Sequence, residues 1–233
     1  MTPIAVLRMR PPTQPTGKAT VTALGQAGST AAGGFGIAVN VQPSQLLVVL
    51  CTFTLSNTDW TAINISDTLG GTYTEAGTCS RSSGATMLRM YVRDTLIATS
   101  GSITVTANAS AGNTTGGFVA VLAISNRSVQ TAGLAAVKVG GIQSEGAGGT
   151  TPAPALGGIP NVANPIIAAV NTNANAVAVT PRAGYTENYE LSYNTPGTTF
   201  EVMSRNSGES SQTITWGASL ANAYCAIAQE FYS

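Results

Sequence analysis

The distribution of β-branched residues constrains the fold of this chain more than any other feature. After residue 17 they gather in short segments bounded by Gly, Ser, Asn or Thr. Such segments are typical of β-strands, and apolar residues almost nowhere recur at the period of a helix. The sequence therefore predicts an all-β chain. We expect strands near residues 19–24, 36–41, 46–55, 60–66, 71–76, 86–93, 101–107, 117–125, 135–142, 164–171, 176–180, 198–205, 211–217 and 222–231.

Three of these segments predict where the sheet surfaces lie. Residues 46–50 and 118–124 are apolar at almost every position, which indicates strands buried on both faces. Between Met87 and Arg93, polar and apolar residues alternate more clearly. This alternation predicts a strand with one face in water.

A weak internal repeat indicates how the strands are organised. Gly71-Thr-Tyr-Thr-Glu75 recurs as Ala183-Gly-Tyr-Thr-Glu187, and three further matches follow in the same order. They are Met90–Val92 with Val202–Ser204, Thr104–Ser110 with Thr213–Ser219, and Gly117–Ile124 with Ala223–Glu230. We therefore expect a jelly-roll-like antiparallel β-sandwich over residues 18–233, with two similar halves at about 18–139 and 164–233. Two separate domains of about 110 residues are the alternative.

The segments outside these halves have distinctive compositions. Residues 140–163 are rich in Gly, Ala, Pro and Thr, and they form either one long connection or a linker. Residues 1–17 are rich in Pro and predict an extended N-terminal arm. The basic residues of this region precede Asp59, the first acidic residue, and guanidinium groups pair well with carboxylates. The candidate docking residues of the arm region are Ile4, Leu7, Arg8, Arg10 and Lys18, with a solvated arm as the alternative.

Composition excludes several classes of protein. Charged residues make up 9% of the chain, ten basic and ten acidic side chains balance, and histidine is absent. Such a chain lacks the basic footprint of a nucleic-acid-binding domain and cannot form a Ser-His-Asp triad. The longest apolar run near the N-terminus, Ile4–Leu7, is shorter than the roughly 7–15 residues of a signal peptide, and no run elsewhere reaches the roughly 20 residues of a membrane helix. We therefore expect no membrane span, and synthesis in a cytosol-like compartment.

The remaining chemical groups predict no active site. Cys51, Cys79 and Cys225 have no CxxC spacing, so we expect buried thiols rather than a zinc site. A carboxylate pair for glycoside cleavage would have to come from Asp67, Glu75, Glu187 and Glu190, and Asp67 precedes a Gly-Gly turn that it is suited to stabilise. We predict no catalytic, metal-binding or cofactor-binding residue. The candidate contacts for a glycan are Trp60, Tyr189 and Tyr193.

A set of motifs in a fixed order suggests a family. It comprises Ser66-Asp-Thr-Leu-Gly-Gly-Thr-Tyr73, the strand Met87–Val92, Ser102-Ile-Thr-Val-Thr, the Gly- and Thr-rich connection, the Ala-Gly-Tyr-Thr-Glu turn and the strand Tyr224–Phe231. This set, over about residues 45–233, resembles β-sandwich structural proteins of tailed-bacteriophage virions, namely capsid decoration, head-spike and fibre components.

The resemblance implies a non-enzymatic virion protein, most of all a capsid decoration or cement protein that binds and stabilises the head. It implies the major capsid protein and sister subunits as partners, in a homo-oligomer for which a trimer is the form common in the family. It also implies assembly in the bacterial cytoplasm. The basic arm departs from the family pattern and fits capsid docking. The alternative is a carbohydrate-binding module of a head or tail appendage that contacts a host glycan.

Overall fold

The computed structural model describes residues 17–29, 34–55, 63–80, 87–109, 114–145, 148–174, 177–194 and 197–233. In these residues the chain forms antiparallel strands and one short 3-10 helix, η1 (Gly133–Ala136). The strands are β1 (Thr20–Ser29), β2 (Phe35–Val41), β3 (Leu46–Leu55), β4 (Ile63–Asp67), β5 (Tyr73–Ser80), β6 (Met87–Arg93), β7 (Gly101–Ala109), β8 (Thr114–Ser125), β9 (Val137–Glu145), β10 (Ile166–Thr172), β11 (Thr186–Asn194), β12 (Gly197–Arg205) and β13 (Tyr224–Phe231).

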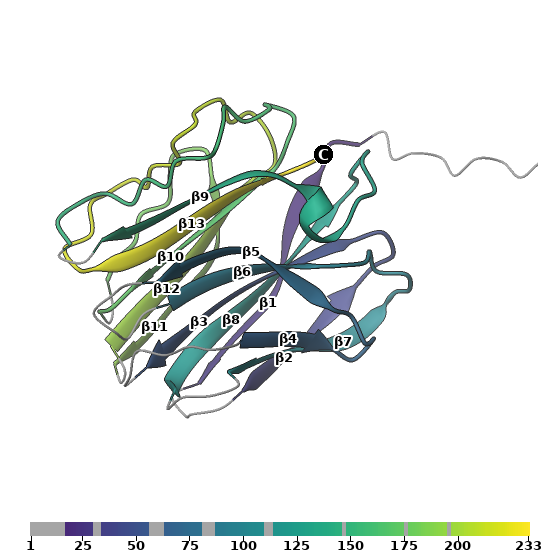
Figure 1. Cartoon of the computed structure of the whole chain (residues 1–233), viewed down its shortest axis with the longest axis horizontal. Helices are drawn as coiled ribbons and strands as arrows, with labels where there is room; N and C mark the ends of the chain where they lie inside the picture. The colour runs from purple at the N-terminus through teal and green to yellow at the C-terminus, as the bar shows by residue number, and fades with distance from the viewer. Residues whose placement is uncertain are drawn as a thin grey trace, which may run out of the picture.

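The strands form three antiparallel sheets that pack face to face (Figure 1). The central sheet has the order β1-β8-β3-β6-β5, the three-stranded sheet has the order β2-β7-β4, and the C-terminal sheet has the order β11-β12-β10-β13-β9. The predicted all-β, antiparallel, sandwich-like fold is therefore confirmed. The structure differs in having three layers of sheet where one sandwich of two sheets was expected.

The first half of the chain has a nested strand order. β1 pairs with β8, β2 with β7 and β3 with β6, so that the outermost strands in sequence pair with each other. A rolled-up hairpin of this kind would be completed by a pair between β4 and β5, but β5 pairs with β6 in the central sheet. The finer jelly-roll assignment therefore stays a prediction.

The central sheet is buried on both faces. Alternate residues of β3 enter different cores: Leu46, Val48 and Leu50 face the C-terminal sheet, and the residues between them face the three-stranded sheet. β8 alternates in the same way. Strands that are covered on both sides need apolar residues at every position, which confirms the prediction from residues 46–50 and 118–124.

The same layering shows that the prediction of one water-exposed face for residues 87–93 was wrong. Tyr91 and Arg93 are buried beneath the three-stranded sheet, and Arg89 is partly buried. The two arginines tolerate this position because Arg89 pairs with Glu75 at 3.0 Å and Arg93 with Asp67 at 2.7 Å. The alternating polar residues predicted contact with water, but ion pairs satisfy the two arginines instead, and of these pairs the one between Arg93 and Asp67 is buried.

A third core lies on the outer face of the C-terminal sheet. Segments without named strands cover it with Leu156, Val179, Ile214, Trp216 and Leu220. Isolated backbone hydrogen bonds tie these segments together, such as the Ile214 amide to the Pro154 carbonyl at 3.1 Å and the Trp216 amide to the Pro152 carbonyl at 2.9 Å. This layer occupies the place that the three-stranded sheet has on the central sheet.

The two five-stranded sheets correspond in order. Each strand of the C-terminal sheet has a counterpart at the same position of the central sheet, and all neighbours are antiparallel. In order, β9, β13, β10, β12 and β11 correspond to β1, β8, β3, β6 and β5. β5 has a bulge after Glu75, and β11 has one after Glu187, which are the last residues of the two matched Tyr-Thr-Glu motifs. The internal repeat remains a prediction about the sequence, and these features are consistent with it.

Several predicted boundaries were wrong in the second half. β11 was missed because polar residues dominate its sequence, although Tyr189, Leu191 and Tyr193 alternate and pack on the core. Residues 177–180 and 211–217 form no named strand, and β9 extends through the first residues of the expected connection 140–163. In each case tertiary contacts outweighed the local composition.

Candidate functional site

The end of the molecule that carries Gly17 and Ser233 holds a surface pocket of about 390 Å³. β1 begins there and β13 ends there, beside η1 (Figure 1). The pocket is lined by Gly17, Lys18, Ala19, Ser128, Val162, Ala163, Ser207 and Ser233. Its wall is therefore built from five segments that are far apart in the sequence.

A buried arginine fixes the last residues of the chain against this wall. Arg127 is 1% exposed, and its Nε donates to the Tyr232 carbonyl at 2.8 Å. Its Nη1 donates to the Thr131 carbonyl at 2.7 Å. Burial lowers the pKa of the Arg127 guanidinium to about 10, so the group remains charged at neutral pH. Arg127 thus holds the strand end in place through neutral carbonyl acceptors.

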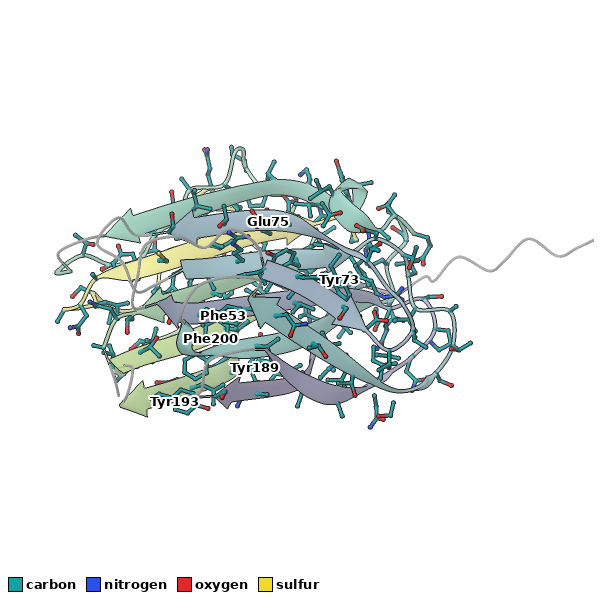
Figure 2. The ribbon with its side chains drawn as sticks, turned by 60° about the horizontal axis from the view of Figure 1, so that its bottom comes forward. Phe53, Tyr73, Glu75, Tyr189, Tyr193 and Phe200 are labelled. Carbon is teal, nitrogen blue, oxygen red and sulfur yellow. The ribbon has the colours of Figure 1, made fainter. Side chains whose placement is uncertain are left out.

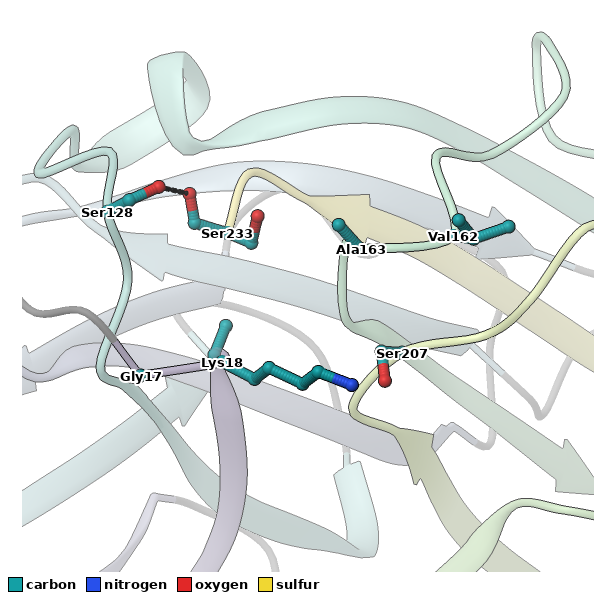
Figure 3. A pocket seen from close by; sticks show the side chains of 8 residues that line it. Gly17, Lys18, Ser128, Val162, Ala163, Ser207 and Ser233 are labelled. Atoms are coloured by element: carbon teal, nitrogen blue, oxygen red, sulfur yellow. Dashed lines mark hydrogen bonds between the residues drawn. The ribbon is translucent and has the colours of Figure 1, made fainter.

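Hydrogen bonds between segments shape the pocket itself. The Ser128 hydroxyl donates to the Ser233 carbonyl at 2.6 Å (Figure 3). The Ser233 amide donates to Asn164 Oδ1 at 3.1 Å, and the Gly208 amide donates to the Val162 carbonyl at 2.6 Å. Figure 3 shows the Lys18 side chain extending across the pocket toward Ser207. Lys18 is the charged side chain among the described residues that line it.

Exposed apolar side chains lie on the segments that line the pocket or directly adjoin it. Of the seven large hydrophobic residues that are exposed in the described part of the chain, five lie on these segments. They are Val129, Leu134, Ile159, Val162 and Tyr232, which we call the terminal patch. Ile159 is 72% exposed and Val162 is 55% exposed. A group of exposed apolar residues of this kind marks an interaction surface more often than scattered single residues do.

The loops that carry the patch are tied to β13. The Val129 amide donates to the Ser233 carbonyl at 3.1 Å, and the Tyr232 amide donates to the Ala136 carbonyl at 3.0 Å, at the end of η1. The Asn161 amide donates to Glu230 Oε1 at 2.8 Å. These bonds hold the terminal patch on a fixed frame. Sequence reasoning missed the patch, because its members are single apolar residues within turns, which carry only a weak signal.

The structure places one of the predicted docking residues at this pocket. Lys18 lines it, directly before β1. Ile4, Leu7, Arg8 and Arg10 lie outside the described residues. The described chain therefore begins, at Gly17, at the end of the molecule that carries the terminal patch.

The predicted glycan contacts are placed differently. Trp60 lies outside the described residues. Tyr193 stacks on Phe118 with ring centroids 4.7 Å apart, and the Tyr189 hydroxyl donates to the Val121 carbonyl at 3.3 Å. Both tyrosines lie on β11 near Phe200 (Figure 2), and burial raises the pKa of Tyr189 to about 12. Their rings pack β11 against the central sheet.

The carboxylates considered for glycoside cleavage serve two separate regions. Asp67 and Glu75 form ion pairs with arginines of β6, whereas Glu187 and Glu190 are exposed on β11 of the C-terminal sheet. Asp67 also accepts hydrogen bonds from the amides of Leu69 and Gly71, as the turn interpretation predicts. The four groups therefore form no single cluster.

Three buried glutamates, Glu201, Glu209 and Glu230, were not singled out from the sequence, and Glu201 has the strongest shift in pKa. Glu201 on β12 is opposite Glu190 in the register and is fully buried beside Trp216. Burial, with the nearby charges of Glu187 and Glu190, raises the pKa of Glu201 to about 8. The group therefore carries a proton at neutral pH, and its full burial keeps it out of reach of a substrate.

Comparisons with known proteins identify no family for this chain. No family model, curated protein or solved structure matches the chain. Within the described residues no helix has the length and apolar character needed to span a membrane, and no group of three or more Cys, Asp or Glu side chains is arranged to hold a metal ion.

Proposed function

We propose that this chain is a non-enzymatic structural protein of a tailed-bacteriophage virion, which binds the outside of the capsid as a decoration protein. The observation that carries this proposal is the terminal patch, which lies at the end of the molecule where the described chain begins, directly after the basic arm in the sequence. The motif resemblance over residues 45–233 supports the same class of protein. The terminal patch and the arm would form one docking surface for the capsid.

The mechanism is the burial of this end against the shell. Apolar side chains of the terminal patch leave water on contact, which favours binding by about 25 cal/mol per Å² of apolar surface removed. Lys18, with Arg8 and Arg10 in the arm, supplies positive charge for carboxylates of the major capsid protein. Each bound copy stabilises the assembled shell by mass action, because it binds the assembled form and not the free subunits.

The proposal includes contacts between sister subunits. Only 9% of the residues are charged, so the exposed edges of the sheets carry few charges that would prevent association. A homo-oligomer covers such edges, and a trimer matches the threefold positions of an icosahedral shell. We do not extend the proposal to glycan binding, since Tyr189 and Tyr193 pack within the molecule.

A binding assay with matched variants tests the proposal. Capsids from which this chain has been deleted are mixed with purified protein, and the bound fraction is measured by co-sedimentation. We expect Val162→Asp to weaken binding at least about tenfold, because a charge in the buried patch must be desolvated. Ile142→Asp is the control, since Ile142 is similarly exposed, at 58%, but lies on β9 outside the patch.

The arm is tested in the same assay. Arg8→Glu with Arg10→Glu is expected to weaken binding and to reduce its dependence on salt. Equal binding by the wild type, Val162→Asp and the arm variant would contradict docking through this end. Failure of the wild type to bind at all would contradict the decoration function itself.

A further inference from the structure

Two of the three cysteines meet between the central sheet and the C-terminal sheet. Cys79 is on β5 and Cys225 is on β13, and both are buried in the core that the two sheets share. The thiol of Cys225 lies within hydrogen-bonding reach of the Cys79 sulfur. Both are reduced in this structure.

Independent backbone contacts fix the same geometry. The Cys79 thiol donates to the Gln143 carbonyl of β9 at 3.1 Å. In the pairing of β9 with β13, Gln143 is opposite Ala226 and Ser144 is opposite Cys225. The Cys79 sulfur therefore contacts β9 beside the residue that pairs with Cys225 of β13.

Cys51 has a different environment. It lies on the other face of β3, in the core between the central sheet and the three-stranded sheet. Burial raises the pKa of the Cys51 thiol far above its usual range, whereas the hydrogen bond from Cys225 lowers the pKa of Cys79. Because the thiolate is the attacking species, Cys79 is the more reactive of the two.

The strand that carries Cys79 borders the molecular surface, although the Cys79 side chain is buried. β5 is an edge strand of the central sheet, and the neighbouring residue Thr78 lines a surface groove of about 640 Å³ between β5 and β9. Elements with few neighbours open locally at a lower free energy than the centre of a core. Local opening of β5 would bring Cys79 into contact with solutes while Cys51 stayed inside the central sheet.

We propose that Cys79 and Cys225 form an intramolecular disulfide when the chain meets a low-molecular-weight disulfide. The Cys79 thiolate attacks the oxidant, forms a mixed disulfide and releases one thiolate. The Cys225 thiolate then displaces the second thiolate and closes the bond. Both released thiolates take up the protons lost by the two cysteines, so the oxidant is reduced to two thiols as the bridge forms.

The bridge would tie the edge of the central sheet to the C-terminal sheet. Most of the chain lies between Cys79 and Cys225, so the bridge would strongly restrict the conformations of the unfolded state. For a virion protein that is assembled in a reducing cytoplasm and then released, the bridge would form after release. This last consequence rests on the proposed function, whereas the bridge itself does not.

Refolding of the purified full chain in a buffer of reduced and oxidised glutathione tests the proposal. Refolding exposes every thiol to the oxidant, so burial cannot prevent the reaction. The remaining thiols are alkylated in denaturant, and linked peptides are identified by mass spectrometry. We expect a Cys79–Cys225 peptide pair, alkylation of Cys51 alone, and a midpoint of thermal unfolding at least about 5 °C above that of the reduced chain.

Two variants make the outcome specific. Cys51→Ala should form the same bridge and leave no thiol to alkylate, whereas Cys225→Ala should lose the bridge and leave two. Alkylation of all three cysteines in the refolded wild type, or a bridge that includes Cys51, would overturn the proposal. The wild-type peptide map gives this answer even if Cys225→Ala fails to fold.

Discussion

Buried charged side chains have the clearest individual effects in this molecule. Asp67 illustrates this, because its carboxylate accepts hydrogen bonds from Arg93 at 2.7 Å, from the Tyr73 hydroxyl at 2.9 Å and from two turn amides. Burial acts to raise the pKa of Asp67, but the bonds from Arg93, Gly71 and Tyr73 together bring it below its usual value. A comparable set in the second half joins Tyr185, Arg205 and Glu209.

The first prediction concerns the loss of this carboxylate. We expect Asp67→Asn to lower the free energy of unfolding by about 3 kcal/mol, because it leaves the buried Arg93 without its charged partner. Glu75→Gln is the control, since this carboxylate is one-third exposed and its pair with Arg89 is worth at most about 1 kcal/mol. Urea unfolding at pH 7 measures both. Equal losses in the two variants would show that burial of the Asp67 pair has no special effect.

The second prediction is a dependence of stability on pH at Glu201. The pKa of this group is raised to about 8 in the folded state from an ordinary value of 4.5. Its contribution to stability is therefore fully present below pH 4.5 and is lost as the pH rises through about 8. We expect urea unfolding to show a fall in stability between about pH 4.5 and about pH 8 that is much smaller in Glu201→Gln. Glu75→Gln is the control and should show the same decrease as the wild type. If Glu201→Gln also keeps the full decrease, the pH dependence comes from other groups.

At the scale of elements, the strands that the sequence predicts best are those buried on both faces. Residues 46–51 of β3 and 118–124 of β8 include no polar residue, so composition alone places these strands at the centre. The edge strand β11 was missed because only Tyr189, Leu191 and Tyr193 mark its buried side. The terminal patch could not be predicted, because it depends on three-dimensional contacts among turns that are far apart in the sequence.

The third prediction concerns the close packing of β9 against the segment that covers it. A Cβ atom at Gly141 would collide with the backbone of Ala155, whereas one at Gly158 would meet open space. We expect Gly141→Ala to destabilise the protein by about 1–3 kcal/mol, since a backbone neighbour cannot move aside easily. Gly158→Ala should change stability by less than about 1 kcal/mol. Thermal unfolding of both variants, followed by circular dichroism, measures the difference, and equal midpoints would contradict this packing.

At the scale of the whole molecule, the largest core joins the two halves of the chain. It lies between the central sheet and the C-terminal sheet. Buried polar groups also bridge this interface, where Asn171 of β10 donates to Thr52 of β3 and accepts from Thr198 of β12 at 2.8 Å. Composition predicted the all-β class, but the division into three layers follows from contacts between strands far apart in the sequence, both within the first half and between the halves, that no local pattern contains.

The fourth prediction follows from this shared core. We expect the chain to unfold in one cooperative transition, because separating the halves would expose apolar side chains of both five-stranded sheets to water. Scanning calorimetry measures this as equality of the calorimetric and van't Hoff enthalpies. Two resolved transitions would instead support the alternative of two independent domains.

The number of copies of this chain in purified virions tests the proposed function most directly. Quantitative mass spectrometry compares peptides of this chain with peptides of the major capsid protein in the same particles. A capsid decoration protein is expected at hundreds of copies in each particle, in a simple ratio to the capsid subunit. Its absence from the particles would contradict the virion function, and a few copies per particle would contradict decoration of the shell.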